Sequence, residues 1–154
     1  MITAALTAIA LALPQHAVVV PGKSFAGLRL GTTETQVQAA WGPRYGRCRD
    51  CSRLTWYFTY KKFEPQGAGV SFRSGAAAAF FTIWSPPGWH TNRGLTVGDP
   101  EAVITQLYGV LPRAECGMYS ALVIRGRRTD TQIYVYQKEV WGFGLSSAGA
   151  PPCH

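Results

Sequence analysis

The sequence has few charged residues and lacks the common short motifs of enzyme active sites. Charged residues make up 15% of its 154 residues, and only eight of them are carboxylates. Neither Gly-x-Ser-x-Gly nor His-Glu-x-x-His nor a phosphate-binding glycine loop occurs. Glu34 and Glu101 are expected in the first turns of helices, where a negative charge favours the helix dipole. We therefore predict a non-catalytic protein that uses no cofactor and no metal ion.

A long hydrophobic run is also lacking. The apolar stretch from Met1 to Leu13 is too short for a transmembrane helix, which needs about 20 apolar residues. Its length is typical of a signal peptide, so residues 1–17 are predicted to be one, cleaved after Ala12 or Ala17. A buried N-terminal helix is the alternative. No cysteine follows the run to carry a lipid, so the sequence predicts a secreted or cell-envelope exterior protein without an anchor.

The few charges that are present are mostly positive. The formal net charge is +7, carried mainly by arginine. Such a surface attracts anionic partners, so we expect a protein or an anionic envelope component as the partner. The basic residues are scattered and form no continuous stripe, which makes nucleic acid an unlikely partner. The alternative is an ordinary solvated surface.

Four cysteines, an even number, favour two disulfides in an oxidising compartment. The favoured pairing is Cys48 with Cys51 and Cys116 with Cys153; other pairings would join the two halves of the chain. Two functional alternatives stay open for Cys48-Arg-Asp-Cys51. It could be a redox pair, which would make the chain a thiol-disulfide protein. It could also supply half of a zinc site, although no second Cys-x-x-Cys occurs.

The chain repeats one pattern. Residues 27–42 and residues 94–109 both begin with Gly-Leu-x-x-Gly, continue with an amphipathic segment containing an early Glu, and end with an aromatic residue and Gly. Thr32 and Asp99 are expected as helix N-caps. β-Branched and aromatic segments follow each helix, separated by turn residues; they are 54–60, 68–73, 78–84, 118–124, 131–137 and 140–145. Residues 18–24 and 85–90 are expected to be linkers.

The pattern predicts an α+β fold. Two tandem repeats, at residues 18–85 and 86–154, would each contain a helical segment followed by antiparallel strands. Together they would form a curved sheet with the helices packed on one face. Strand alternation leaves the other face open and places Tyr57, Arg73, Tyr134 and Tyr136 on it as the binding surface. Trp56, Phe58, Trp141 and Phe143 are assigned to the core, and a covering loop or strand is the alternative for the tyrosines.

In each half, Gly-Leu-x-x-Gly is followed by a capped helix, an aromatic residue with Gly, and antiparallel strands. This arrangement resembles the repeat of the SmpA/OmlA (BamE-like) outer-membrane assembly lipoproteins. Its tandem form with cysteines is similar to the beta-lactamase inhibitor protein (BLIP-like) family. The resemblance covers about Phe25 to Leu145. The first family implies envelope scaffolding with a lipidated cysteine, which this sequence does not have. The second implies inhibition of an enzyme through exposed aromatic side chains on a concave sheet.

The intact mass of the exported protein, measured before and after alkylation under native conditions, tests the export and disulfide predictions. We expect a mass that corresponds to cleavage after Ala12 or Ala17, with no alkylated cysteine. A retained N-terminus with Cys48 and Cys51 freely alkylated would contradict both predictions and favour the thiol or metal alternatives.

Overall fold

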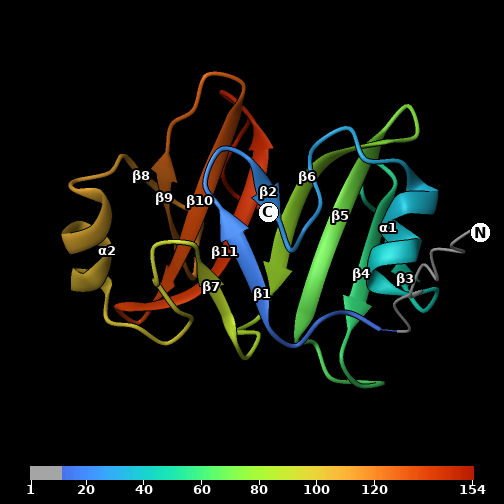
Figure 1. Cartoon of the computed structure of the whole chain (residues 1–154), viewed down its shortest axis with the longest axis horizontal. Coiled ribbons are helices and arrows are strands. Elements are labelled where there is room, and N and C mark those ends of the chain that lie inside the picture. Colours follow the sequence, from blue (N-terminus) through green and yellow to red (C-terminus); the bar gives the residue numbers. More distant parts are fainter. Residues whose placement is uncertain (1–11) are drawn as a thin grey trace, which may run out of the picture.

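One large antiparallel sheet of eight strands dominates the computed structural model, which describes residues 12–154 (Figure 1). In the order in which they pair, the strands are β3 (Gly46–Arg47), β4 (Thr55–Thr59), β5 (Gly67–Arg73), β6 (Ala76–Ile83), β11 (Glu139–Ser147), β10 (Thr129–Tyr136), β9 (Ser120–Ile124) and β8 (Arg113–Glu115). The β6–β11 pairing joins the two halves of the sheet, with Gly144, Leu145 and Ser146 opposite Phe81, Phe80 and Ala79.

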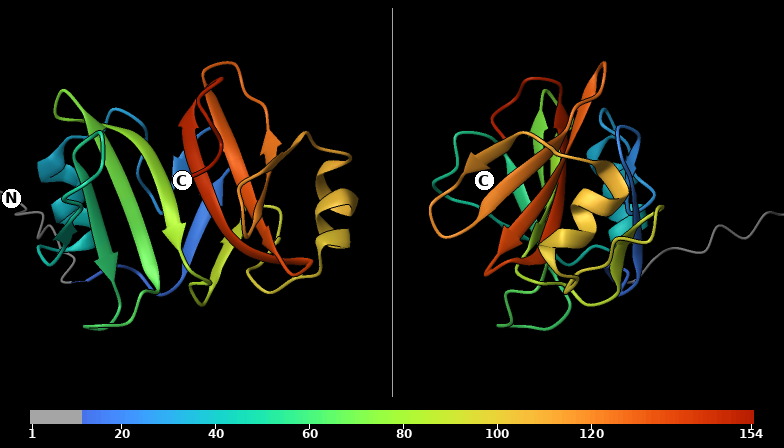
Figure 2. Two further views of the ribbon diagram at one scale, coloured as in Figure 1. Left: turned by 180° about the vertical axis from the view of Figure 1, so that it is seen from behind. Right: turned by 90° about the vertical axis from the view of Figure 1, so that its left-hand side faces the viewer.

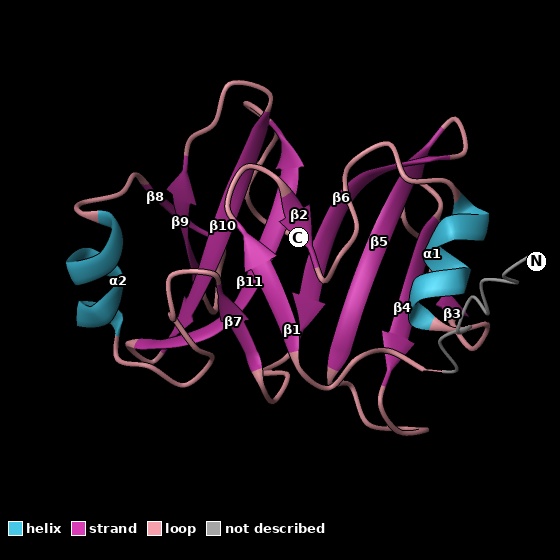
Figure 3. Cartoon of the chain, viewed as in Figure 1, coloured by secondary structure: helices cyan, strands magenta, loops and turns pink. Residues whose placement is uncertain are grey.

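A second, three-stranded sheet lies over the middle of the large one. It consists of β2 (Ser24–Phe25), β1 (Ala17–Val20) and β7 (Trp89–Thr91), in that order. Strands β1 and β7 pair in parallel although they are far apart in the sequence. The helices α1 (Glu34–Trp41) and α2 (Glu101–Tyr108) lie at opposite ends of this layer (Figure 3).

The main core fills the space between the large sheet and the layer of small sheet and helices (Figure 2, right). The helices contribute Val37, Trp41 and Ile104, and the small sheet contributes Val19, Phe25 and Trp89. The large sheet contributes the alternate residues of its central strands, including Trp56, Phe58, Val70, Phe80, Ile133, Phe143 and Leu145. The layer of small sheet and helices therefore packs on only one face of the large sheet.

Both helices have eight residues, and each begins one residue later than the expected caps indicate. Thr33, not Thr32, caps α1, because its side chain and that of Gln36 form a reciprocal capping box. Pro100 holds the cap position of α2, and Asp99 instead accepts a hydrogen bond from the Thr96 amide over 2.8 Å. Asp99 therefore stabilises the preceding turn and not the helix end.

The predicted α+β fold of two helix-plus-strand repeats is wrong. The structure is mostly β: among residues 12–154, 42% lie in strands or bridges and 11% in helices, and eight of the strands form one continuous sheet. The supposed linkers are one reason for the error. Residues 18–24 and 85–90 contribute to β1, β2 and β7, because segments such as Val18-Val19-Val20 pair with strands that only the folded chain brings near.

The start of the predicted signal peptide lies outside the described residues, which begin at residue 12; its expected end, Ala17, is the first residue of β1. The boundaries drawn at residues 85 and 86 stay a prediction. Within residues 12–154, no helix is long and apolar enough to cross a membrane.

Glycines within the strands leave room for aromatic rings to lie across the sheet. A Cβ added to Gly144 in β11 would collide with the Tyr134 hydroxyl and would lie 2.7 Å from Gln132 Oε1, both on the neighbouring strand β10. Gly69 in β5 makes room for the Phe81 ring in the same way. The sequence signal is a glycine in a strand interior, which often marks such a close approach.

We expect Gly144→Ala to lower the free energy of unfolding by about 1–3 kcal/mol, because the new methyl group must displace Tyr134. Gly46→Ala is the matched control, since a Cβ at that position in β3 meets nothing within 4 Å. Urea unfolding with the disulfides intact provides the measurement. Equal stability of the two variants would contradict the close packing of Tyr134 on Gly144.

Candidate binding groove on the sheet face

The face of the large sheet that points away from the helices carries its own apolar cluster. The cluster has a buried centre of Phe81, Ala121 and Tyr134. Partly buried side chains surround it, namely Tyr57, Ile83, Cys116, Tyr119 and Trp141. No helix packs on this cluster within the described chain, so its shape depends on the side chains themselves and on the segment after β11.

The segment after β11 folds back over this face, and the chain ends there (Figure 2, left). Asp130 in β10 holds the start of the segment by accepting a hydrogen bond from the Gly149 amide over 2.9 Å. Burial of Asp130 opposes its ionisation. The Gly149 and Gly126 amides and the Arg125 guanidinium outweigh this effect and hold the pKa of the carboxyl below its usual value. Asp130 is therefore a charged anchor for the C-terminal segment.

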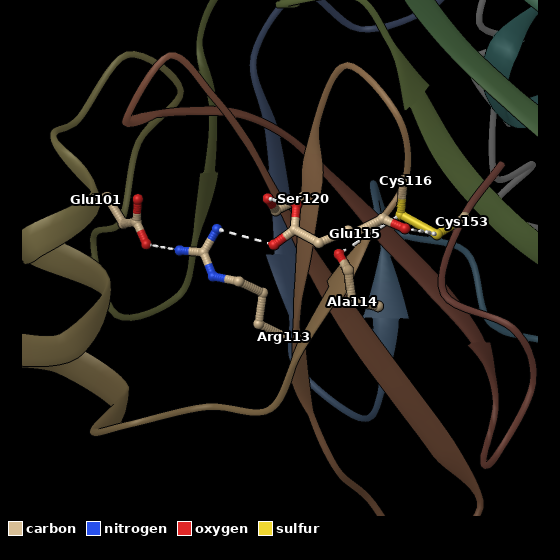
Figure 4. Close-up of polar contacts among 7 residues, drawn as sticks. All are labelled: Glu101, Arg113, Ala114, Glu115, Cys116, Ser120 and Cys153. Atoms are coloured by element: carbon tan, nitrogen blue, oxygen red, sulfur yellow. Dashed lines mark hydrogen bonds and ion pairs between the residues drawn. A yellow bond between two sulfur atoms is a disulfide. The ribbon is translucent and has the colours of Figure 1, made fainter.

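The far end of the same segment is fastened by the disulfide between Cys153 and Cys116. Cys116 follows β8, which pairs with β9 and whose Arg113 forms an ion pair with Glu101 of α2 (Figure 4). Ser120 also donates to Glu115 over 2.8 Å across the β8–β9 pair. The C-terminal segment is thus tied to a strand that is itself tied to α2.

His154, just beyond the bridge, lies on the aromatic cluster. Its ring stacks on Phe81 with centroids 4.6 Å apart and planes 14° apart, and it meets Tyr134 edge-on at 6.2 Å. The Tyr119 hydroxyl donates to the His154 carbonyl and accepts from its amide, each over 2.8 Å. His154 as a whole is exposed, but these contacts remove water from its ring, and this desolvation lowers the pKa of His154 from 6.5 to about 4.

A groove of about 490 Å³ runs between this C-terminal segment and the loop closed by the Cys48–Cys51 disulfide. The loop and strand β4 contribute Cys51, Ser52, Arg53, Thr55 and Tyr57; β5 and β6 contribute Ser71, Arg73, Ala78, Ala79 and Phe81; the C-terminal part contributes Ser146, Ser147, Ala150, Pro151, Cys153 and His154. None of these lining residues is an Asp or a Glu. Disulfide-bonded segments therefore form both walls of a basic, hydroxyl-rich groove.

A smaller aromatic hollow of about 240 Å³ lies beside the groove. It is lined by Thr82, Ile83, Trp84, Tyr119, Tyr134 and Trp141, and it shares Tyr57, Phe81 and His154 with the groove. The three shared side chains stand between the two spaces. One end of the open face is therefore cationic and the other end is aromatic.

The structure brings only two of the four predicted binding residues into the groove. Tyr57 and Arg73 line it. Tyr136 is 36% exposed but packs beside Trp141, outside both spaces. Tyr134 is on the expected face, yet it is buried at 3% exposure, and this corrects its assignment as an exposed contact residue. The reason is that Tyr119 and His154 cover it.

Burial of Tyr134 has a chemical consequence. Its hydroxyl and Gln132 Oε1 find no hydrogen-bond partner among the described residues. Burial raises the pKa of the Tyr134 hydroxyl well above its ordinary value, so this side chain stays neutral. Tyr134 therefore supports the floor of the open face and does not present a contact to a partner.

Trp141 was assigned to the core by strand alternation, and that assignment is wrong. In the β10–β11 pair, Tyr134 lies opposite Gly142 and Val135 lies opposite Val140, which leaves Trp141 as the extra residue of a β-bulge. The bulge turns Trp141 towards the aromatic cluster, where its ring is 5.6 Å from that of Trp84. Sequence reasoning also missed Arg53 and His154 as groove residues, because their positions depend on a loop and on the C-terminal segment.

The disulfides have the pairing that the sequence favours, Cys48–Cys51 and Cys116–Cys153. Cys48 and Cys51 lie in the loop between β3 and β4. Cys51 Sγ is 3.8 Å from the Tyr57 hydroxyl at the groove wall. Within residues 12–154, no three His, Cys, Asp or Glu side chains gather closely enough to hold a metal ion.

The fold is similar to that of three solved bacterial proteins. The first is a DUF4309 family protein, YjgB, from Bacillus subtilis, with a TM-score of 0.59, 15% identity, and coverage of 80% of this chain and 84% of that one. The second is a cysteine-rich secretory protein from Staphylococcus aureus, with a TM-score of 0.53, 13% identity, and coverage of 89% and 50%. The third is an extracellular protein containing an SCP domain from Bacillus anthracis, with a TM-score of 0.51, 11% identity, and coverage of 76% and 43%.

The chain spans half or less of the latter two proteins, and at these identities the likeness shows the fold alone. No family model and no curated protein matches the sequence. The resemblance to the SmpA/OmlA and BLIP-like families stays a prediction.

The His154 ring should titrate with a midpoint near pH 4 in the folded protein. Because the folded pKa is depressed, the stacked ring contributes stability that is complete above pH 6.5 and is lost as the pH falls towards 4. NMR detection of the imidazole Cε1–H signal measures the midpoint. The variant Cys116→Ser/Cys153→Ser, which frees the segment, should shift it back towards 6.5. A midpoint near 6.5 in the disulfide-bonded protein would contradict the stacked position.

Proposed function

We propose that this protein is an exported, non-catalytic binding protein that holds its partner in the groove between its two disulfide-bonded segments. The observation that carries the proposal is the groove itself, which lies on the sheet face that the fold leaves open. Its walls are fixed by covalent bonds and by the Asp130 anchor, so a partner meets a preformed surface. Preformed walls favour binding because less conformational entropy is lost when the partner binds.

Export is supported by several independent features. Both disulfides suit an oxidising compartment, and the apolar N-terminal run has the length of a signal peptide. Two proteins of similar fold are described as secretory and extracellular. We therefore propose that the protein works outside the cytoplasm, as a secreted or envelope-exterior protein.

Charge supports an anionic partner, either a protein face or an anionic envelope component. The net charge is +7, and the groove contributes Arg53 and Arg73 without an acidic side chain in its lining. Tyr57 adds an aromatic surface with a polar tip beside them. Arginine and tyrosine are among the side chains that are enriched where binding energy is concentrated at interfaces.

Site-specific photo-crosslinking tests this function. A photoreactive phenylalanine analogue is placed at Ser52, an exposed groove residue, and in a control protein at Phe63, which is 92% exposed outside the groove. We expect the protein exported by its own cells to form a discrete crosslinked adduct from position 52 and none from position 63. Adducts of equal yield from both positions, or none from position 52, would overturn the groove as the binding site.

A further inference from the structure

Two arginines, Arg53 and Arg73, line one end of the groove, and neither forms an ion pair among the described residues. Thr55 and Ser71 face each other across β4 and β5, and the Phe72 amide donates to the Leu54 carbonyl, so the pairing continues past the end of β4. This register brings Arg53 beside Arg73 at the same end of the strand pair. The ion pairs found in residues 12–154 involve neither side chain, and no Asp or Glu side chain lines the groove.

Hydroxyl groups continue from the arginines along the groove. Thr55 and Ser71 share a hydrogen bond of 3.0 Å, and Ser146 accepts from Gln132 over 2.9 Å. The Ser52 and Ser147 hydroxyls have no hydrogen-bond partner in the described chain, so both are available to a ligand. Paired guanidinium groups with adjacent hydroxyl donors match the donors that bind phosphate oxygens, since arginine can donate two parallel hydrogen bonds to an oxyanion.

The dimensions of the groove indicate the size of the ligand. A volume of about 490 Å³ is within the range of small-molecule sites. The Cys48–Cys51 loop and the C-terminal segment stand on either side, and Tyr57, Phe81 and His154 close the end next to the aromatic hollow. Such a recess takes a compact group more readily than a flat lipid surface.

We propose that the groove binds a small phosphate-bearing ligand, with Arg53 and Arg73 as its anchors and the Ser52 and Ser147 hydroxyls as further donors. The proposal rests on the proposed binding function and names the ligand chemistry of that same groove. The phosphate can belong to a free phosphate ester or to the headgroup of a lipid, and the geometry of the recess favours the free ester.

Calorimetric titration of the folded, disulfide-bonded protein tests the proposal, with inorganic phosphate and glycerol 3-phosphate as probes. We expect saturable binding of both, weakened roughly tenfold or more in Arg53→Gln/Arg73→Gln, because charge-assisted hydrogen bonds are lost. The matched control is Arg29→Gln/Arg127→Gln, which removes the same charge from exposed positions outside the groove and should bind like the unmodified protein. Thermal melting checks that both variants are folded.

Three other results would contradict the phosphate proposal. Equal weakening in both double variants would indicate a general effect of net charge and would overturn the proposal. Binding to phosphatidylglycerol vesicles, but not to either small probe or to phosphatidylcholine vesicles, would indicate that the protein binds an anionic membrane surface. That result would also overturn the proposal. A crosslink from Ser52 combined with no phosphate binding would reject the ligand chemistry while leaving the proposed function in place.

Discussion

The packing of Phe25 against three other aromatic side chains is the contact on which the rest of the structure depends. Phe25 is fully buried in β2, and its ring lies 5.1 Å from Trp89 of β7, 5.7 Å from Phe80 of β6 and 6.2 Å from Trp41 of α1. One side chain thereby connects the small sheet, the first helix and the large sheet. Burial of a phenylalanine contributes about 1.5–3 kcal/mol, and edge and stacking contacts add to it. The small sheet is held to one face of the large sheet mainly by contacts of this kind.

The opposite face is open as a direct consequence. Both helices and all three strands of the small sheet pack on the side of Phe80, so the residues that alternate with it, such as Phe81 and Ala79, are left to other partners. The C-terminal segment covers part of that face, held by Asp130 and by the Cys116–Cys153 bridge. The part that it leaves uncovered is the groove. The position of the candidate binding groove thus follows from which face of the large sheet packs against the small sheet and the helices.

Much of the local structure could be predicted from the sequence because it depends on local patterns. The six long strands lie within one or two residues of their predicted bounds, and both helices end at the expected glycines, Gly42 and Gly109. The site was less predictable. Tyr134 and Trp141 were misplaced because the first is covered by a distant segment and the second lies in a bulge. Alternation along one strand contains no information about either effect.

The sequence by itself determined the positions of the six long strands, the two glycines at which the helices end, the basic surface and the presence of four cysteines available for pairing. These properties follow from side-chain pattern and composition, which act over a few neighbouring residues or over the whole chain at once. Only the tertiary structure decided that Ala17, Val18 and Val19 pair with β7, that His154 lies on Phe81, and that Arg53 and Arg73 share one groove. Each of these contacts joins segments far apart in the chain or depends on a loop. Their formation depends on the total free energy of packing and not on the preference of any single segment.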